Sequence, residues 1–346
     1  SSKDWNNAMI VLTFYFSSGQ RESEEIRTAL LDLEKKYPIQ IVFVDVLQDE
    51  QLAKAYRDLV PIIKIGPYRL QYPFTAQDMQ VTISAAVSRH EHLEKVGDTA
   101  HSRKVERGHT LTSADRISLW LSKHYMALIN VMLAIYIGLP FLAPVLANNG
   151  VQAPARVIYA IYSPLCHQLP YRSFFLFGAQ PYYPRALADI NGVGTYEDFF
   201  GENSTQVTTV RKFTGMEEIG AGVGRLGYKV ALCERDVAIY LALLAFGILF
   251  SVTGRKIRPL SWYLWIAIGI VPIGLDGVSQ LPSLISMFPD WIIMGESTAV
   301  LRVLTGALFG LATAWFHYPM IEESMNGTRN LLAGKRNIIP QLQKSE

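Results

Sequence analysis

Four long apolar stretches dominate the second part of the chain, at residues 125–146, 230–252, 260–281 and 298–320. A hydrocarbon core of about 30 Å needs about 20 apolar residues in a helix, so each stretch is long enough to cross a membrane. Backbone groups in lipid must be hydrogen-bonded within their own segment, which favours helices. We therefore expect an all-α polytopic membrane domain at residues 125–320 with four transmembrane helices.

Lysine and arginine gather on one side of these stretches. They occur before the first stretch, between the second and third, and after the fourth, for example at Lys123, Lys256 and Arg329. Basic loops stay in the cytoplasm. The first residues, Ser-Ser-Lys-Asp-Trp, have no basic region followed by an apolar core, which predicts no cleaved signal peptide. We expect a bacterial inner-membrane protein with both termini cytoplasmic, an extracytoplasmic insert at residues 147–229 and a cytoplasmic tail at residues 321–346.

The first 90 residues have the charge of an ordinary soluble domain and alternate strand and helix patterns. Apolar runs of β-forming residues predict strands, and apolar residues spaced three or four apart predict helices. The predicted strands are residues 8–16, 39–45, 62–65 and 68–70, and the predicted helices are residues 21–34, 49–58 and 75–90. The order βαβαββα requires a right-handed crossover between the first two strands. We expect an α/β domain at residues 1–90, then a linker and interfacial helix at residues 91–124.

This order of elements resembles the glutaredoxin and thioredoxin fold. Val60-Pro61 lies where that family keeps a cis-proline, and the turn at residues 17–23 lies where it keeps Cys-x-x-Cys. Here Gln20 and Ser23 occupy the paired positions, and neither supplies the thiolate that thiol exchange requires. An edge-strand proline is the alternative explanation of Pro61. The resemblance therefore implies a redox-inactive, thioredoxin-like docking domain.

Polar residues unusual for a membrane domain occur at the outer ends of the predicted spans. They are Cys166, His167, Gln168, Arg172, Cys233, Arg235, Asp236, Asp276, Gln280, Glu296 and Arg302. Charged side chains in spans are costly, so they usually face the bundle interior and pair. We expect Asp236 and Asp276 to pair with Arg172, Arg235 or Arg302. The cluster is either a functional site or a structural network of ion pairs.

Several motifs in this part of the chain resemble a family of small bacterial and archaeal membrane proteins of unknown function. They are Ser-Pro-Leu-Cys-His-Gln-Leu-Pro-Tyr-Arg-Ser-Phe at 163–174, Cys-Glu-Arg at 233–235, and Leu-Asp-Gly-Val-Ser-Gln at 275–280. The resemblance covers residues 125–319. That family usually has Cys-x-Arg-Cys at the second motif, whereas here the last position is Asp236.

Cys166 and Cys233 are the only cysteines, too few for a disulfide framework or a four-cysteine zinc site. They form one disulfide, or they contribute with His167 and Asp236 to a site for a single metal ion. The net charge of +2 implies no nucleic-acid partner.

Three functions stay open. We expect a non-catalytic, cofactor-free accessory subunit of a multi-subunit membrane complex, of the energy-transducing kind, with lipids and other subunits as partners. The alternatives are a metal-binding or thiol-redox membrane protein that uses Cys166, His167 and Cys233, and a small transporter component. Four spans without an internal repeat argue against a transporter that acts alone.

Overall fold

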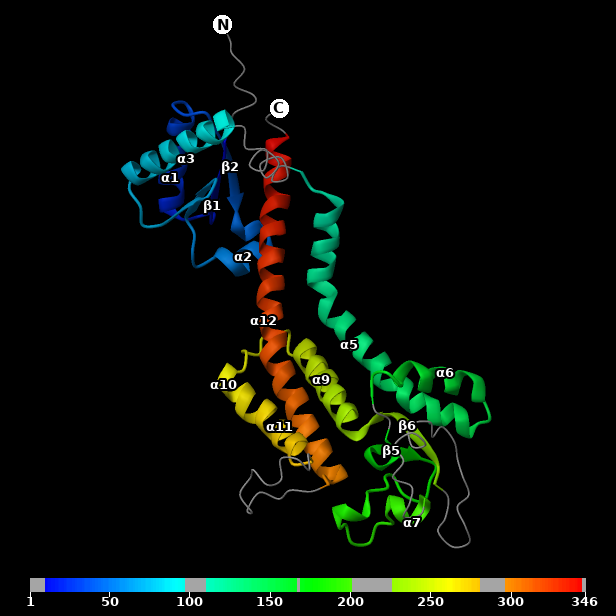
Figure 1. Ribbon diagram of the computed structural model, residues 1–346. Helices are drawn as coiled ribbons and strands as arrows, with labels where there is room; N and C mark the ends of the chain where they lie inside the picture. The colour runs from blue at the N-terminus through cyan, green and yellow to red at the C-terminus, as the bar shows by residue number, and fades with distance from the viewer. Residues whose placement is uncertain (1–9, 97–109, 167–168, 201–225, 281–295, 344–346) are drawn as a thin grey trace. The chain divides into compact units, whose positions relative to one another are not determined.

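The computed structural model describes residues 10–96, 110–166, 169–200, 226–280 and 296–343 (Figure 1). The chain divides into two compact units. The first unit contains residues 1–124 and 323–346, and the second contains residues 125–322. His167 and Gln168, which the sequence placed in the polar cluster, lie outside the described residues.

The first unit contains a small mixed sheet with helices packed on it (Figure 1). Its elements are β1 (Ile10–Phe16), α1 (Arg21–Glu34), β2 (Ile39–Asp45), α2 (Glu50–Tyr56), β3 (Ile62–Ile65), β4 (Tyr68–Gln71) and α3 (Ala76–Val96). The strands lie in the order β2-β1-β3-β4. β1 and β2 are parallel, and the other two pairs are antiparallel. This arrangement agrees with the α/β region predicted from the sequence.

The core of the first unit follows from the alternation of side chains along β1. Leu12 and Phe14 point to the same face because residues two apart in a strand do so, and both are fully buried. They pack with Ile26 and Leu30 of α1 and with Ile83 of α3. One face of the sheet is therefore covered by α1 and α3.

The turn before α1 holds the positions at which the resemblance implied lost cysteines. Ser23 is buried, and its hydroxyl donates a hydrogen bond of 3.4 Å to the side-chain oxygen of Gln20, which is the N-cap residue of α1. The Val60–Pro61 peptide bond is cis, as the resemblance implied. The two side chains thus make a local polar contact at the start of the helix.

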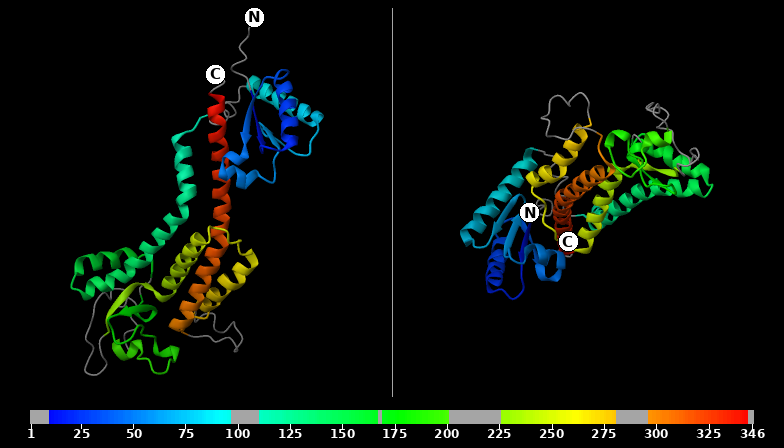
Figure 2. Two further views of the ribbon diagram at one scale, coloured as in Figure 1. Left: turned by 180° about the vertical axis from the view of Figure 1, so that it is seen from behind. Right: turned by 90° about the horizontal axis from the view of Figure 1, so that it is seen from below.

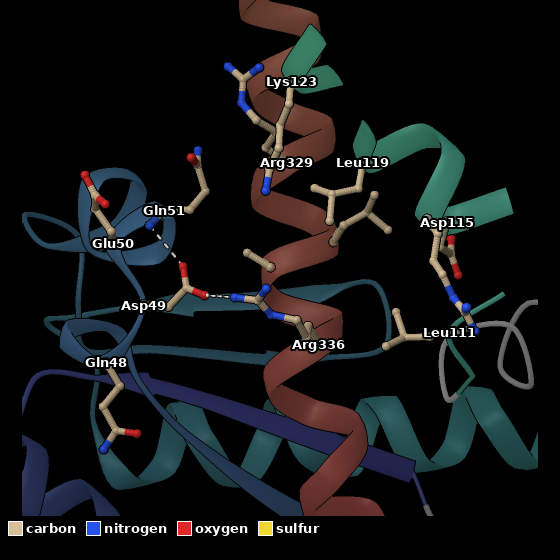
Figure 3. Close-up of a pocket in the computed structure, with 13 residues that line it drawn as sticks. Gln48, Asp49, Glu50, Gln51, Leu111, Asp115, Leu119, Lys123, Arg329 and Arg336 are labelled. Atoms are coloured by element: carbon tan, nitrogen blue, oxygen red, sulfur yellow. Dashed lines mark hydrogen bonds and ion pairs between the residues drawn. The ribbon is translucent and has the colours of Figure 1, made fainter. Parts of the chain in front are cut away.

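A cavity of about 550 Å³ lies in the first unit, lined by α2, the first turns of α5 (Ser113–Asn148) and the last turns of α12 (Ala299–Leu342) (Figure 3). Arg336 of α12 pairs with Asp49 at 2.9 Å, and Lys335 pairs with Asp115 at 2.6 Å. These contacts hold the end of α12 in the first unit. The predicted tail at residues 321–346 is therefore mostly the continuation of the last helix.

The second unit is mainly helical. Beside parts of α5 and α12 it contains α6 (Gln152–Tyr162), β5 (Ser173–Leu176), α7 (Tyr196–Phe200), β6 (Tyr228–Cys233), α9 (Glu234–Val252), and a helical segment made of α10 (Trp262–Leu264), η5 (Trp265–Ile270, π-helical) and α11 (Val271–Val278). Short 3₁₀ turns precede β5 and α7. In Figures 1 and 2, α9 and α11 lie beside the first half of α12.

Two glycines allow α12 to approach α9 closely. A Cβ atom added at Gly306 would lie 2.7 Å from the carbonyl oxygen of Arg235, and one at Gly310 would overlap the carbonyl oxygen of Ile239. Small residues four apart permit such contact between helix backbones. The Gly-x-x-x-Gly pair therefore sits at a helix–helix interface.

Within the described residues, three helices are long and apolar enough to cross a membrane. They are Ser113–Asn148, Glu234–Val252 and Ala299–Gln343. Many of their apolar side chains are exposed, including Met132 on α5 and Val252 on α9. A helix that exposes apolar side chains widely suits lipid rather than water. The apolar helix Trp262–Val278 is shorter than these three.

The structure corrects three boundaries. α3 extends to Val96, into the predicted linker, and the predicted interfacial helix is continuous with the first apolar stretch in α5, because no proline or glycine separates them. Residues 230–233, predicted as the start of a span, form part of strand β6. They pair with β5, so the second unit contains a two-stranded sheet and is not entirely α-helical.

Candidate metal centre and ion-pair network

The junction between β6 and α9 positions two of the cluster residues. Cys233 ends the strand and is the N-cap residue of α9, and its sulfur accepts a 3.5 Å hydrogen bond from the backbone N–H of Asp236. This contact satisfies one of the free N–H groups that every helix start leaves. Cys166 follows α6, and its sulfur accepts a 3.2 Å hydrogen bond from the backbone N–H of Cys233.

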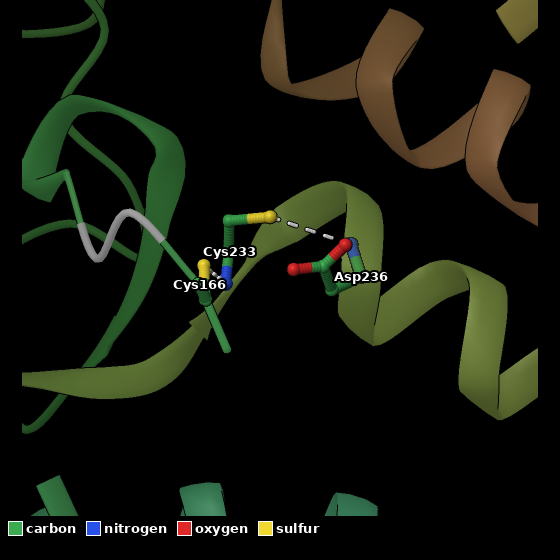
Figure 4. Close-up of side chains that lie close together, drawn as sticks. All are labelled: Cys166, Cys233 and Asp236. Carbon is green, nitrogen blue, oxygen red and sulfur yellow. Dashed lines mark hydrogen bonds between the residues drawn. The ribbon is translucent and has the colours of Figure 1, made fainter. Parts of the chain in front are cut away.

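Three possible metal ligands meet at this junction (Figure 4). The sulfurs of Cys166 and Cys233 and a carboxylate oxygen of Asp236 all lie within 4.8 Å of one another. Cys166 is buried, and Cys233 and Asp236 are partly buried. Both cysteines are free thiols, so no disulfide joins them. The expectation that the two cysteines come close agrees with this geometry.

The electrostatics of the junction disfavour three negative charges without a cation. The hydrogen bond with the Cys166 thiol, together with burial and the nearby charge of Asp236, raises the pKa of the Cys233 thiol. The N–H of Asp236 acts in the opposite direction. A bound cation would lower the pKa of these thiols instead, because it compensates the negative charge of the deprotonated form. In the absence of a cation, the raised pKa therefore keeps Cys233 as a neutral thiol.

Lys229 is a buried residue near the cluster that the sequence did not single out. It lies in β6, and its backbone oxygen accepts a hydrogen bond from the hydroxyl of Tyr159. Burial lowers the pKa of Lys229 to about 7, and the charge of Cys166 opposes the fall. The sequence gave no signal that Lys229 is buried. It was expected at the end of the polar insert at residues 147–229, whereas the structure places it in strand β6.

Arg235 and Asp276 form one ion pair of the network. The Arg235 guanidinium donates to Asp276 Oδ2, which also accepts a 3.3 Å hydrogen bond from the hydroxyl of Thr305. The Asp276 side chain is almost fully buried. This pair was among those expected from the sequence, and it joins α9, α11 and α12.

Arg302 forms the centre of a second group of charges. Its Nε donates to Glu234 at 2.8 Å, its Nη1 donates to Glu296 at 3.4 Å, and its Nη2 donates to the carbonyl oxygen of Tyr171 at 3.2 Å. Arg172 pairs with Glu296 at 3.1 Å. Of the three candidate partners of the aspartates, Arg235 pairs with Asp276, whereas Arg172 and Arg302 pair with glutamates. Glu234, which the sequence places beside Cys233 and Arg235, is the principal partner of Arg302.

Asp236 differs from the other acids, since no ion pair among the described residues includes it. Its helix turn directs it toward the two sulfurs instead (Figure 4). Gln280 donates a 2.7 Å hydrogen bond to the carbonyl oxygen of Asp276. Asp276 Oδ1, Arg235 Nε and Gln280 Oε1 are buried without a hydrogen-bond partner. These buried polar atoms remain available for a further hydrogen bond or ligand.

A cavity of about 380 Å³ opens onto the cluster. Its lining includes both cysteines and Asp236, three guanidiniums, and two apolar side chains: Cys166, Cys233, Asp236, Arg172, Arg235, Arg302, Leu165 and Leu169. The two cysteines and Asp236 therefore share this cavity with three guanidinium groups.

The comparisons agree with a membrane protein. Residues 225–316 match a family model described as "Predicted membrane protein (DUF2085)". The matched part includes Cys233, Asp236, Asp276 and Arg302. It is shorter than residues 125–319, the region over which the sequence motifs resemble a family of membrane proteins. The class that these observations support is a predicted membrane protein of unknown function with three candidate spans.

A distant relative is known from an archaeon. The uncharacterized protein MJ1492 of Methanocaldococcus jannaschii is 26% identical over 212 residues, which cover 59% of this chain and 96% of that protein. No solved structure matches the chain. The alignment spans almost the whole archaeal protein but only 59% of this chain. The archaeal protein therefore has no counterpart for the remaining part of this chain.

Proposed function

We propose that the second unit binds one divalent transition-metal ion, of the zinc class, through Cys166, Cys233 and Asp236. The observation that carries the proposal is the meeting of two sulfurs and a carboxylate oxygen within 4.8 Å, from two separate parts of the chain. Thiolate ligands select soft or borderline metals such as zinc, whereas calcium and magnesium prefer oxygen. Two sulfurs with one carboxylate therefore favour zinc.

The number of ligands suggests a site with an open position. Structural zinc sites use four protein ligands, and catalytic or substrate-binding sites use three and leave the fourth position to water or a ligand. The cavity beside Cys166 and Cys233 provides room for that fourth group. The hydrogen bond from the N–H of Cys233 to the Cys166 sulfur supplies outer-shell support of the kind that orients metal ligands.

The purified full-length protein is expected to bind one Zn²⁺ or Co²⁺ ion per chain. Mass spectrometry of the metal content measures the stoichiometry, and the charge-transfer absorption of Co²⁺ reports bonds to sulfur. Replacing a residue that only hydrogen-bonds to a metal ligand typically lowers metal affinity by about 10–100-fold. Loss of a ligand itself costs more, so Cys233→Ser is expected to weaken binding by roughly 100-fold or more.

Asp236→Asn removes the carboxylate ligand and is also expected to weaken metal binding. Asp189→Asn is its matched control, because Asp189 is exposed and is neither in the cluster nor in the lining of its cavity. The control is expected to keep the wild-type affinity. A protein that takes up no metal while both cysteines are demonstrably reduced, or Co²⁺ absorption without sulfur charge transfer, contradicts the proposal.

We also propose that the chain crosses the inner membrane four times, with helix Trp262–Val278 as the additional span and both termini in the cytoplasm. The basic residues at Lys123, Lys256 and Arg329 support this orientation. The first unit is then a cytoplasmic, thioredoxin-like domain. The strand order β2-β1-β3-β4 supports that fold, and Gln20 and Ser23 argue against thiol chemistry there.

The second candidate function is an accessory subunit of a larger membrane complex. The observation in its favour is that the α/β unit has Gln20 and Ser23 at the two positions where thioredoxin-like proteins have cysteines. A domain of this kind without the cysteines is better suited to binding than to redox chemistry. After gentle extraction from native membranes, the protein is expected to migrate with partner subunits on a native gel. Migration as a free monomer or homodimer contradicts this function and leaves metal binding standing.

A further inference from the structure

The two cysteines of the cluster lie side by side at the junction of β6 and α9 (Figure 4). Their sulfurs are two of the three atoms that all lie within 4.8 Å of one another, and both cysteines are free thiols. The Cys166 sulfur also accepts the 3.2 Å hydrogen bond from the backbone N–H of Cys233. It therefore lies against the backbone from which the Cys233 side chain extends, which is the placement that a bond between the two sulfurs requires.

The charge balance at the junction disfavours two neighbouring thiolates. The hydrogen bond with the Cys166 thiol and burial raise the pKa of the Cys233 thiol, and the charge of Asp236 acts in the same direction. A cation relieves this by compensating the charge of the deprotonated sulfurs. A disulfide relieves it as well, because it removes both protons and leaves no charge on either sulfur. The two solutions exclude each other, since only a thiolate serves as a metal ligand.

A buried cation lies near Cys166. Lys229 is fully buried in β6, and the charge of Cys166 raises the pKa of this lysine against the effect of burial. A neighbouring ammonium group in turn favours the thiolate, which is the nucleophilic form of a cysteine. Both cysteines also line the cavity of about 380 Å³. A water molecule occupies about 30 Å³ of liquid, so an oxidant as small as hydrogen peroxide fits beside the sulfurs.

We propose that hydrogen peroxide converts Cys166 and Cys233 into a reversible disulfide, and that this bond abolishes metal binding. The loss of metal rests on the function proposed above, whereas the disulfide does not. One thiolate attacks a peroxide oxygen, the O–O bond breaks, and a sulfenic acid and one water molecule form. The second thiol then displaces the hydroxyl group as another water molecule. The pair of thiols loses two electrons and two protons, and peroxide gains them.

The disulfide removes two of the three proposed ligands at once. Asp236 is then the remaining ligand, and zinc sites use three or four protein ligands. The oxidised protein is therefore expected to release its metal ion. A thiol reductant breaks the disulfide by exchange and restores both ligands.

Counting thiols in the full-length protein in detergent tests the disulfide directly, because Cys166 and Cys233 are the only cysteines in the chain. After denaturation, the reduced, metal-free protein is expected to react with two equivalents of a maleimide polymer, and the peroxide-treated protein with none. Dithiothreitol is expected to restore both thiols. Peptide mapping identifies the linked peptides, and a non-reducing gel shows whether the bond lies within one chain.

Three results overturn the disulfide. They are two thiols that persist under peroxide that oxidises free cysteine in the same buffer, oxidation to sulfinic or sulfonic acid without a disulfide, and a bond that joins only separate chains. Cys166→Ser is expected to form no disulfide within the chain. Asp236→Asn removes a metal ligand but neither sulfur, so it is expected to form the disulfide fully while binding metal weakly.

Co²⁺ absorption tests the effect of the disulfide on metal binding. The reduced protein is expected to bind one ion per chain, the oxidised protein none, and the re-reduced protein one again. Asp189→Asn is expected to behave as wild type in both assays. Metal that stays bound to the oxidised protein overturns the control of binding by the disulfide. A reduced protein that binds no metal but forms the disulfide overturns the metal function together with that control, and confirms the disulfide alone.

Discussion

Replacing Arg302 with methionine is expected to destabilise the second unit by about 3–5 kcal/mol, because it leaves buried carboxylates without their cation. The side chains of Arg302 and Glu234 are 3% and 1% exposed, and they pair at 2.8 Å. Glu296 and the carbonyl oxygen of Tyr171 lose a donor in the same change. Methionine fills a similar volume, so the loss reflects charge rather than an empty space.

Thermal and denaturant unfolding of the detergent-solubilised protein measures this effect. Glu234→Gln removes one of the stranded carboxylates, so the double variant Arg302→Met, Glu234→Gln is expected to lose less stability than the two single changes added together. Arg258→Met is the matched control, since Arg258 is exposed and surface changes usually stay within about 0.5 kcal/mol. Additive losses in the double variant, or a cost below about 1 kcal/mol for Arg302→Met, contradict a central role for this pair.

Replacing Gly310 with leucine is expected to cost about 3 kcal/mol or more, by separating α12 from α9. Even a Cβ atom at this position overlaps the carbonyl oxygen of Ile239 and comes within 3.0 Å of the Cβ of Ala242. Overpacking typically costs 1–3 kcal/mol, and a clash with backbone has no side-chain rotamer that relieves it. Unfolding in detergent reports the loss of stability, and Co²⁺ binding reports whether the displacement reaches the cluster at the start of α9.

Gly327→Leu is the control for Gly310→Leu. Gly327 lies in the same helix, is exposed, and has no atom within 4 Å of an added Cβ. Leucine is the better helix former, so this change is expected to be neutral or to stabilise the helix by roughly 0.5–1 kcal/mol. Similar losses for both glycine variants contradict the role assigned to the contact between α9 and α12, because helix propensity alone favours leucine at both positions.

Local signals in the sequence were sufficient for the elements of the first unit. α1 and β2 have the predicted ends, residues 21–34 and 39–45, because charge, apolar spacing and β-forming residues change sharply at those points. The apolar stretches likewise predicted helices suited to lipid, since the requirement for about 20 apolar residues is a property of each segment alone. The sequence also placed Cys233, Arg235 and Asp236 together, because they are neighbours along the chain.

Only the tertiary structure decided how distant residues combine. Residues 230–233 form a strand rather than a helix because β5, more than 50 residues earlier, supplies their hydrogen-bond partners. Arg302 pairs with Glu234 rather than with an aspartate because the close approach of α12 to α9 at Gly306 brings those two side chains together. The cavity of the first unit depends on the end of α12 packing into that unit. A periodic pattern specifies the conformation of one segment, whereas ion pairs, ligand sets and cavities depend on which segments meet, and that is set by packing over the whole fold.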